Sequence, residues 1–156
     1  MIIHNTLIGN GLPGVTMHNH FASSQAPPVN LNDNVIVGNY IAKNHADTAD
    51  AATPGPTGIN VYGFGAVTGT VIAHNVIREE AYDVVANTPA AVSVHLNDLA
   101  GEHAVGVDGI GGATVDATEN WWGCRAGPGS EECSSVAGSG VTFAPWLRQP
   151  SSSPGR

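Results

Sequence analysis

Four segments of the chain share one frame, in which an asparagine follows one apolar residue by three positions and precedes another by two. These asparagines are Asn5, Asn39, Asn75 and Asn120, and they lie 34, 36 and 45 positions apart. A unit that recurs along a chain cannot bury its apolar face alone, so successive copies stack on one another. The frame therefore predicts a stacked, repetitive fold rather than a hairpin sheet.

Between these copies lie short segments in which apolar and polar residues alternate, the pattern of a β-strand. They are residues 15–17, 59–61 and 92–94, and we assign all three to one position of the repeat. The shortest connections on either side of such a segment are 10 and 13 residues, which gives a minimal coil of 23 residues. Longer connections are interpreted as loops, because they are rich in Ser, Pro and Gly.

The sequence thus predicts an all-β parallel β-helix of about four to five coils with irregular loops, formed by residues 1–147 as one domain. Coils stacked about 4.8 Å apart align like side chains along the axis. The asparagines are expected at the bends between strands, because Asn tolerates the left-handed backbone conformation and stacked amides can hydrogen-bond along the axis. Two internal columns are expected: Ile2, Ile36, Ile72 and Ala117, and Leu7, Ile41, Ile77 and Trp122.

Composition and charge restrict the partners of such a rod. The 20 Gly and 10 Pro of this 156-residue chain favour short strands and turns over long helices. With 5 Lys and Arg against 13 Asp and Glu, the net charge is −8, which repels phosphate backbones and other polyanions. No window approaches the about 18 apolar residues of a membrane span. The first residues also lack the pattern of a signal peptide. We expect no nucleic acid partner and no membrane span.

Residues 34–41 and 70–77 resemble the coil repeats of right-handed parallel β-helix proteins, the pectate-lyase-like superfamily. Residues 115–124, 127–129 and 145–147, together with Cys133, look like the end of such a domain, so the chain resembles a C-terminal portion. The resemblance covers most of residues 1–147 and implies a right-handed coil. It implies no single activity, because this fold serves lyases, hydrolases, esterases, epimerases and non-catalytic surface proteins.

The chain departs from the enzymes of that superfamily, which carry clustered acidic calcium ligands with a basic residue, or several Asp on adjacent coils. No such set is found, and four of the five basic residues fall in predicted loops or in the tail. The chain also begins in mid-coil at Ile2, which would leave its first coil uncovered. We expect a short or truncated β-helix that self-associates through this open N-terminal coil. Residues 148–156 are expected to form a disordered tail.

The alternating segments supply one candidate binding row. If the apolar residues of these strands point inward, then His18, Tyr62 and His95 follow them on the outside and would stack on three successive coils. Such a row could bind a sugar ring, hold a metal or transfer a proton. The alternative interpretation is an exposed aromatic stripe on a sheet. His18 and His20 would also share a face, which makes them a weak candidate metal pair; no cofactor is predicted, and a divalent metal is possible.

The loops after Asn39 and Asn75 leave the predicted barrel at one corner and carry charged residues. Glu79, Glu80 and Asp83 are therefore catalytic candidates beside His95, because two carboxylates held across a groove can perform glycoside hydrolysis. A solvated charged loop is the alternative interpretation.

Cys124 and Cys133 lie in one Gly-, Pro- and Ser-rich loop. They are expected to form a disulfide, and reduced thiols or half of a metal site are the alternatives. A disulfide favours an extracellular or cell-envelope location.

These observations favour a non-catalytic, carbohydrate-associated or surface-structural β-helix module that binds a carbohydrate or another small molecule. The alternatives are a polysaccharide-active hydrolase or lyase and, more weakly, a metal-binding β-helix protein.

Overall fold

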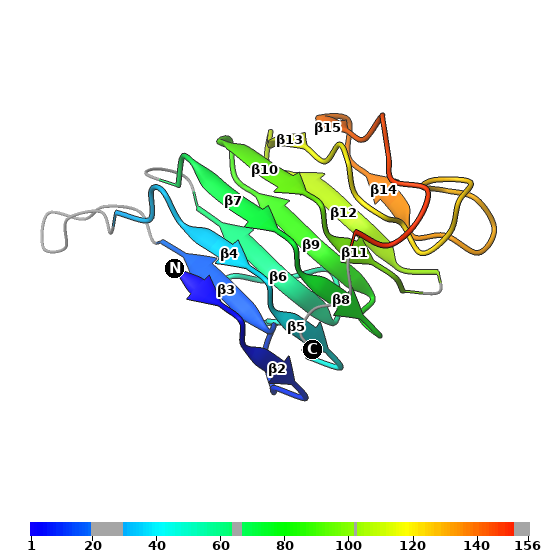
Figure 1. Ribbon diagram of the computed structural model, residues 1–156. Helices are drawn as coiled ribbons and strands as arrows, with labels where there is room; N and C mark the ends of the chain where they lie inside the picture. The colour runs from blue at the N-terminus through cyan, green and yellow to red at the C-terminus, as the bar shows by residue number, and fades with distance from the viewer. Residues whose placement is uncertain (20–29, 64–66, 102, 152–156) are drawn as a thin grey trace, which may run out of the picture.

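Three parallel sheets form the protein, and the chain winds through them in sequence order (Figure 1). The computed structural model describes residues 1–19, 30–63, 67–101 and 103–151. Sheet A contains β1 (Ile2–Ile3), β4 (Val35–Val37), β7 (Thr70–Ala73), β10 (Ala91–His95), β13 (Thr114–Asp116) and β15 (Val141–Thr142). Sheet B contains β2 (Thr6–Ile8), β5 (Tyr40–Ala42), β8 (Val76–Arg78) and β11 (Asp98–Leu99). Sheet C contains β3 (Val15–His18), β6 (Thr57–Tyr62), β9 (Tyr82–Asn87), β12 (Val105–Ile110) and β14 (Ser135–Ala137).

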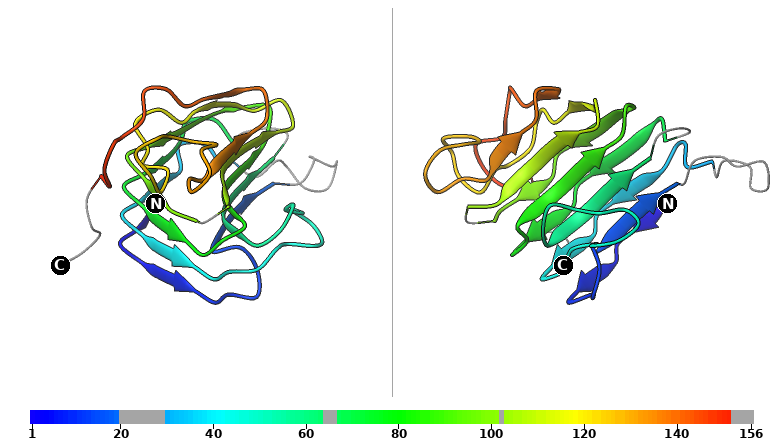
Figure 2. Two further views of the ribbon diagram at one scale, coloured as in Figure 1. Left: turned by 90° about the vertical axis from the view of Figure 1, so that its right-hand side faces the viewer. Right: turned by 180° about the vertical axis from the view of Figure 1, so that it is seen from behind.

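The predicted fold class is confirmed: the chain forms a parallel β-helix of about five coils (Figure 2). Strands of neighbouring coils pair in register, so aliphatic residues stack on aliphatic residues in the enclosed core. The predicted columns through Ile36 and Ile41 exist, and each gains one member from a further coil, Val94 in the first and Leu99 in the second. Trp122 ends the second column and is fully buried.

A buried asparagine ladder runs along the corner between sheets A and B. Each asparagine after Asn5 accepts, through its Oδ1, the backbone N–H and the Nδ2–H of the asparagine one coil earlier, at 2.9–3.1 Å. Each interior Nδ2 also donates to a backbone carbonyl of the preceding coil, as Asn75 does to Ile36. Each asparagine, a rung of the ladder, therefore provides hydrogen-bond partners for backbone groups that have no strand partner at the bend.

The ladder has a fifth member, Asn97, which the frame-based prediction missed. It lies 22 positions after Asn75 and 23 before Asn120, so the predicted gap of 45 residues contains one further coil. Both spacings agree with the minimal coil of 23 residues. The signal was present in the sequence, because Val94 and Leu99 flank Asn97 in the required frame.

The left-handed backbone conformation at this corner belongs to the residue before each asparagine and not to the asparagine itself. Positive φ angles of 53–67° occur in all five coils, at His4, Gly38, His74, Leu96 and Glu119. The side chain of each following asparagine then spans the bend and hydrogen-bonds to the neighbouring coil. The expected reason for asparagine at this corner was thus wrong, although its position and its axial hydrogen bonds are confirmed.

A second, shorter ladder follows the end of sheet B. Asn10 donates its N–H and Nδ2–H to Asn44, which in turn donates both to the carboxylate of Glu80 at 2.8–3.2 Å. Residues with positive φ precede each rung, as in the first ladder. Glu80 is therefore a buried structural acceptor at a position where the two earlier coils use asparagine.

The assignment of residues 92–94 to the same sheet as residues 15–17 and 59–61 was wrong. They lie in β10, which pairs with β7 in sheet A, whereas the strand that continues β6 in sheet C is β9. Strand β9 does not alternate, because both of its faces are covered: Val84 faces the core and Val85 is also fully buried. Asn60, the partner of Val85 in β6, donates to the carbonyl of Ala51 in the preceding long loop, which covers the outer face here.

The two ends of the stack differ. At the C-terminal end, Phe143 and Trp146 pack against the core, and backbone hydrogen bonds tie residues 142–147 to the last coil. Ser151 donates to the carbonyl of Leu96, and residues 152–156 of the predicted tail lie outside the described residues. The first coil lies at the opposite end (Figure 1).

We predict that the ladder contributes to stability rung by rung. Asn97→Ala would leave the N–H and Nδ2–H of Asn75 and the carbonyl of Ile72 without their partners inside the core. We expect the free energy of unfolding in urea to fall by about 3 kcal/mol. The matched control is Asn5→Ala at the exposed end of the ladder, which should cost about 1 kcal/mol or less. Equal losses for the two variants would contradict the assigned ladder.

Candidate functional site

The predicted outer row of His18, Tyr62 and His95 is only partly correct. His18 and Tyr62 pair across β3 and β6, and their rings meet edge to face with centroids 5.8 Å apart. The next residue in that row is Asn87, not His95. His95 lies in sheet A, on a different face of the β-helix, because residues 92–94 belong to that sheet. A single site built from all three side chains is therefore excluded.

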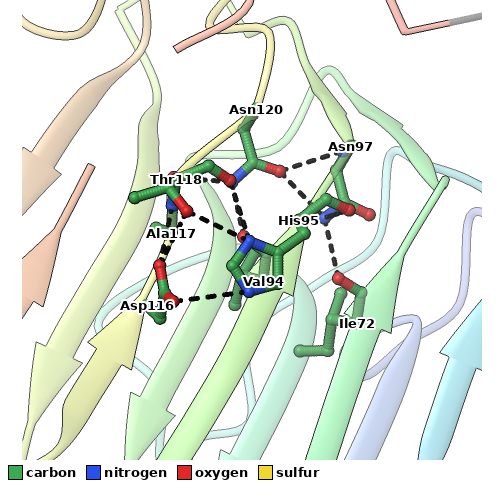
Figure 3. Close-up of polar contacts among 8 residues, drawn as sticks. All are labelled: Ile72, Val94, His95, Asn97, Asp116, Ala117, Thr118 and Asn120. Carbon is green, nitrogen blue, oxygen red and sulfur yellow. Dashed lines mark hydrogen bonds and ion pairs between the residues drawn. The ribbon is translucent and has the colours of Figure 1, made fainter. Parts of the chain in front are cut away.

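His95 instead forms a polar cluster with the next coil, on the outer face of sheet A (Figure 3). Its Nδ1 lies 3.0 Å from the backbone carbonyl oxygen of Thr118, and its Nε2 lies 3.7 Å from Oδ2 of Asp116. The Thr118 backbone N–H and hydroxyl both donate to Oδ1 of Asp116, at 3.2 and 2.9 Å. We call these three residues the His95 cluster.

The hydrogen bonds define which atoms of the cluster remain available. A carbonyl oxygen only accepts, so Nδ1 of His95 carries the proton that it donates to Thr118. Nε2 faces the second oxygen of Asp116, 3.7 Å away. The cluster thus presents an imidazole nitrogen and a carboxylate oxygen side by side at the surface, which suits a ligand that brings hydroxyl groups.

Asp116 is held in its ionised form. Desolvation acts to raise its pKa, but the two hydrogen bonds from Thr118 and the charge of His95 together outweigh it, so the pKa of Asp116 is lowered from its ordinary value. Its side chain is well exposed, with 58% of its surface accessible. Both properties leave an anionic acceptor open to solvent on this face.

The rest of the outer face of sheet A divides into an apolar and a polar half. Register places two columns on it, and their members are all at least partly exposed. The apolar members come from the first three coils, and the polar members from the later coils. The columns are Ile3, Val37, Ala73 and His95, and Val35, Val71, Ser93, Asp116 and Thr142. This face, with the His95 cluster at its polar half, is the candidate site.

Glu79, Glu80 and Asp83 do not form a pair of carboxylates across a groove. Glu79 is exposed and forms an ion pair with Lys43 at 3.3 Å. Glu80 is buried in the second ladder, and its pKa is raised because desolvation outweighs the hydrogen bonds from Asn44. Asp83 was expected in an exposed loop, but it lies in β9 and is fully buried.

Asp83 occupies an unusual position for a carboxyl group. Register aligns it with Gly58 and Gly106 of the neighbouring coils, where an added Cβ would meet core side chains, Ile77 in one case and Trp122 in the other. Among the described residues, no donor reaches either of its carboxyl oxygens. Desolvation, reinforced by the nearby charges of Glu80 and Asp98, raises the pKa of Asp83 well above its ordinary value. Asp83 is therefore a buried group whose surroundings favour its neutral form, and it is not a surface catalyst.

The described residues contain neither a cluster of metal ligands nor a membrane-spanning helix. His20 lies outside the described residues, so the proposed pair with His18 has no geometry to report. In the described part of the chain, no three His, Cys, Asp or Glu side chains converge as metal ligands would. No helix within those same residues has the length and hydropathy needed to cross a bilayer.

The predicted disulfide between Cys124 and Cys133 is confirmed. It borders a cleft of about 590 Å³ at the C-terminal end, which sequence reasoning missed because the two walls come from distant loops. The disulfide loop supplies Glu131 and Glu132 to one wall. The other residues that line the cleft are Ala100, Gly101, His103, Gly123 and Cys124. The cleft and the His95 cluster have no residue in common.

Comparisons with known proteins leave the family open. No protein-family model matches the chain, and no curated protein or solved structure matches it.

We predict that Asp83 makes the fold less stable as pH rises. The pKa of Asp83 is higher in the folded than in the unfolded state, so the folded protein holds a proton that the unfolded chain releases. The free energy of unfolding therefore falls as the pH rises from the unfolded pKa through the folded pKa. Asp83→Ala removes this effect. Chemical unfolding at pH 4 and at pH 7 measures how the substitution changes the free energy of unfolding. The substitution should raise this free energy more, or lower it less, at pH 7 than at pH 4. The same effect of the substitution at both pH values would contradict a raised pKa of Asp83 in the folded state.

Proposed function

We propose that the chain is a non-catalytic, carbohydrate-binding β-helix module of the pectate-lyase-like kind, and that the outer face of sheet A is its binding surface. The observation that carries this proposal is the His95 cluster, whose imidazole Nε2 and carboxylate Oδ2 are held at fixed positions beside an exposed apolar strip. Saccharides present both matching features, because their hydroxyl groups donate hydrogen bonds and their C–H faces are apolar.

Rigidity supports a binding role for this face. The ring of His95 is fixed by the carbonyl of Thr118, and Asp116 is fixed by two hydrogen bonds from the same residue. All three lie on or directly beside paired strands or at a ladder bend, so little side-chain freedom is lost when a ligand binds. The apolar half supplies contact area from Val35, Val37 and Val71 without further ordering.

Charge narrows the ligand class. The net charge of −8 and the ionised Asp116 disfavour uronic acid polymers and sulfated glycans. Neutral saccharides, or those that carry amines, fit the imidazole and the carboxylate of the cluster. The disulfide supports an oxidising location such as the cell surface or the extracellular space, where such ligands occur.

One observation favours a second candidate, a polysaccharide-active enzyme. A histidine with Nδ1 bound to a carbonyl and Nε2 beside a carboxylate can accept a proton from a substrate. The cluster pairs this imidazole with one carboxylate, whereas glycoside hydrolysis ordinarily uses two carboxyl groups that flank the bond. Binding without cleavage is therefore the better supported function.

We predict that His95→Ala and Asp116→Asn each weaken binding of a neutral polysaccharide by about 10-fold or more, since each removes one of the two polar groups that the cluster presents to a ligand. Titration calorimetry against soluble β-glucan, xylan and mannan, with an array of oligosaccharides as the first screen, measures the change. The matched control is His103→Ala, which alters an exposed histidine of the separate cleft and should leave affinity unchanged.

The same samples test the alternatives. Release of reducing ends by the wild type, and its loss in His95→Ala, would show that the protein is an enzyme and not a binding module. Binding that depends on His103 and not on His95 would move the site to the cleft. Absence of binding to every neutral or amino saccharide would refute the proposal.

A further inference from the structure

The disulfide between Cys124 and Cys133 meets the cleft at the C-terminal end through one of its two cysteines. Cys124 lines the cleft and is half-buried. Cys133 is not among the described residues that line it, and only 4% of its surface is exposed. A thiolate attacks a disulfide at the sulfur that it can reach. The cleft therefore gives a thiol access to Sγ of Cys124 and not to Sγ of Cys133.

Small residues keep the cleft open beside this sulfur. Ala100, Gly101 and Gly123 line it and carry a methyl group at most. The resulting volume of about 590 Å³ lies in the range of pockets that hold small molecules. A small thiol therefore has room next to Cys124.

The coil holds both ends of the loop between the two cysteines without help from the disulfide. Before the loop, Trp122 is fully buried in the core. After it, Ser134 is fully buried as well, and its N–H donates to the carbonyl of Trp122 at 3.0 Å. The hydroxyl of Ser134 donates to the carbonyl of Leu99, also at 3.0 Å. Cleavage of the disulfide would therefore release the loop and leave the coil intact.

The loop itself has other contacts near its middle. The ring of Trp146 lies against Gly127, where an added Cβ would clash with it, and its Nε1–H donates to the carbonyl of Arg125. Gly127 and Gly129 both have positive φ angles, of 89° and 80°. The part of the loop after Gly129, which contributes a wall of the cleft, is joined covalently to Cys124 by the disulfide. The disulfide thus fixes the width of the loop at the cleft.

Charge determines which thiols enter the cleft readily. Glu131 and Glu132 line it and are exposed, and neither forms an ion pair within the described part of the chain. Arg125 follows Cys124 in the sequence but is not among the described lining residues. The net charge of −8 adds to the negative potential of the two carboxylates. Such a potential repels anions and attracts cations.

We propose that the disulfide is a redox-reversible lock on the cleft, which a small thiol opens by attack on Cys124, and that the carboxylates favour cationic and uncharged thiols over anionic ones. The thiolate sulfur forms a bond with Sγ of Cys124, and the disulfide bond breaks. Its electron pair passes to Sγ of Cys133, which takes up a proton from water. A second thiolate then attacks the added sulfur, and Sγ of Cys124 leaves with its electron pair and is protonated. Two thiols are thereby oxidised to one disulfide, and the protein disulfide is reduced by two electrons.

The first measurement is the rate at which cysteamine, mercaptoethanol and mercaptoacetate reduce the oxidised, full-length protein. Each rate is divided by the rate at which the same thiol reduces hydroxyethyl disulfide, so that differences in intrinsic reactivity cancel. At low ionic strength, the anionic mercaptoacetate should be slower than the neutral mercaptoethanol by about 5-fold, and the cationic cysteamine should be faster. Salt at about 0.5 M should remove most of this difference.

Substitutions test whether the two carboxylates cause the difference. The combined variant Glu131→Gln and Glu132→Gln should bring the three normalised rates close together. Glu119→Gln is the matched control, because it removes the same charge from an exposed position outside the cleft and should keep the difference. If the combined variant does not fold, the salt series on the wild type decides.

The second measurement locates the first thiol adduct after a short reaction that is stopped with acid. Trypsin cleaves after Arg125, which lies between the two cysteines, so mass spectrometry can assign the adduct to one of them. We expect the adduct on Cys124 and a free thiol on Cys133. Circular dichroism of the reduced protein should be unchanged, and amide hydrogen exchange should become faster only in residues 125–132.

Four results would overturn the proposal. They are a first adduct on Cys133, equal normalised rates for the three thiols, a difference that survives both salt and the combined substitution, and reduction that proceeds only when the strands unfold. These measurements involve no saccharide and no residue of the His95 cluster. Their outcome is therefore independent of the carbohydrate-binding proposal.

Discussion

Hydrogen bonding between stacked asparagines is the interaction on which the rest of this structure depends. A chain that turns sharply between sheets A and B must leave backbone groups at the corner without strand partners. The asparagine side chains satisfy those groups from coil to coil, so the bends of successive coils lie directly above one another along the axis. Register in all three sheets follows from this alignment. The aliphatic columns, the covered core and the flat outer face of sheet A are consequences of it.

The part of the fold that could be predicted is the part encoded by local repetition. Asn39 and Asn75 sit in nearly identical surroundings, so their spacing and flanking aliphatics identified the corner and its columns. Asn97 was missed because residues 92–94, which belong to sheet A, alternate between apolar and polar residues just as residues 15–17 and 59–61 of sheet C do. The alternation alone could not show which sheet residues 92–94 join. Strand β9 was missed because a loop covers its outer face. A strand that is buried on both faces lacks the apolar–polar alternation by which strands are recognised in a sequence.

The candidate site was harder to predict, because its geometry depends on register between coils. His95 could be identified as an outward-facing residue, but Asp116 and Thr118 become its neighbours only when β10 pairs with β13. Glu80 and Asp83 looked like surface acids, since sequence alone does not show that one enters a ladder and the other a buried column. The disulfide could be predicted because both cysteines lie in one loop, whereas the cleft beside it needs two distant loops.

Side-chain amide exchange observed by NMR tests most directly whether five asparagines form one continuous ladder that is buried from Asn39 to Asn120. We expect the Nδ2 hydrogens of Asn39, Asn75, Asn97 and Asn120 to exchange slowly, because each donates inside the fold, while those of Asn5 exchange faster. If Asn97 exchanged as rapidly as Asn5, or if the four interior amides showed no common protection, the ladder and the coil register built on it would be contradicted.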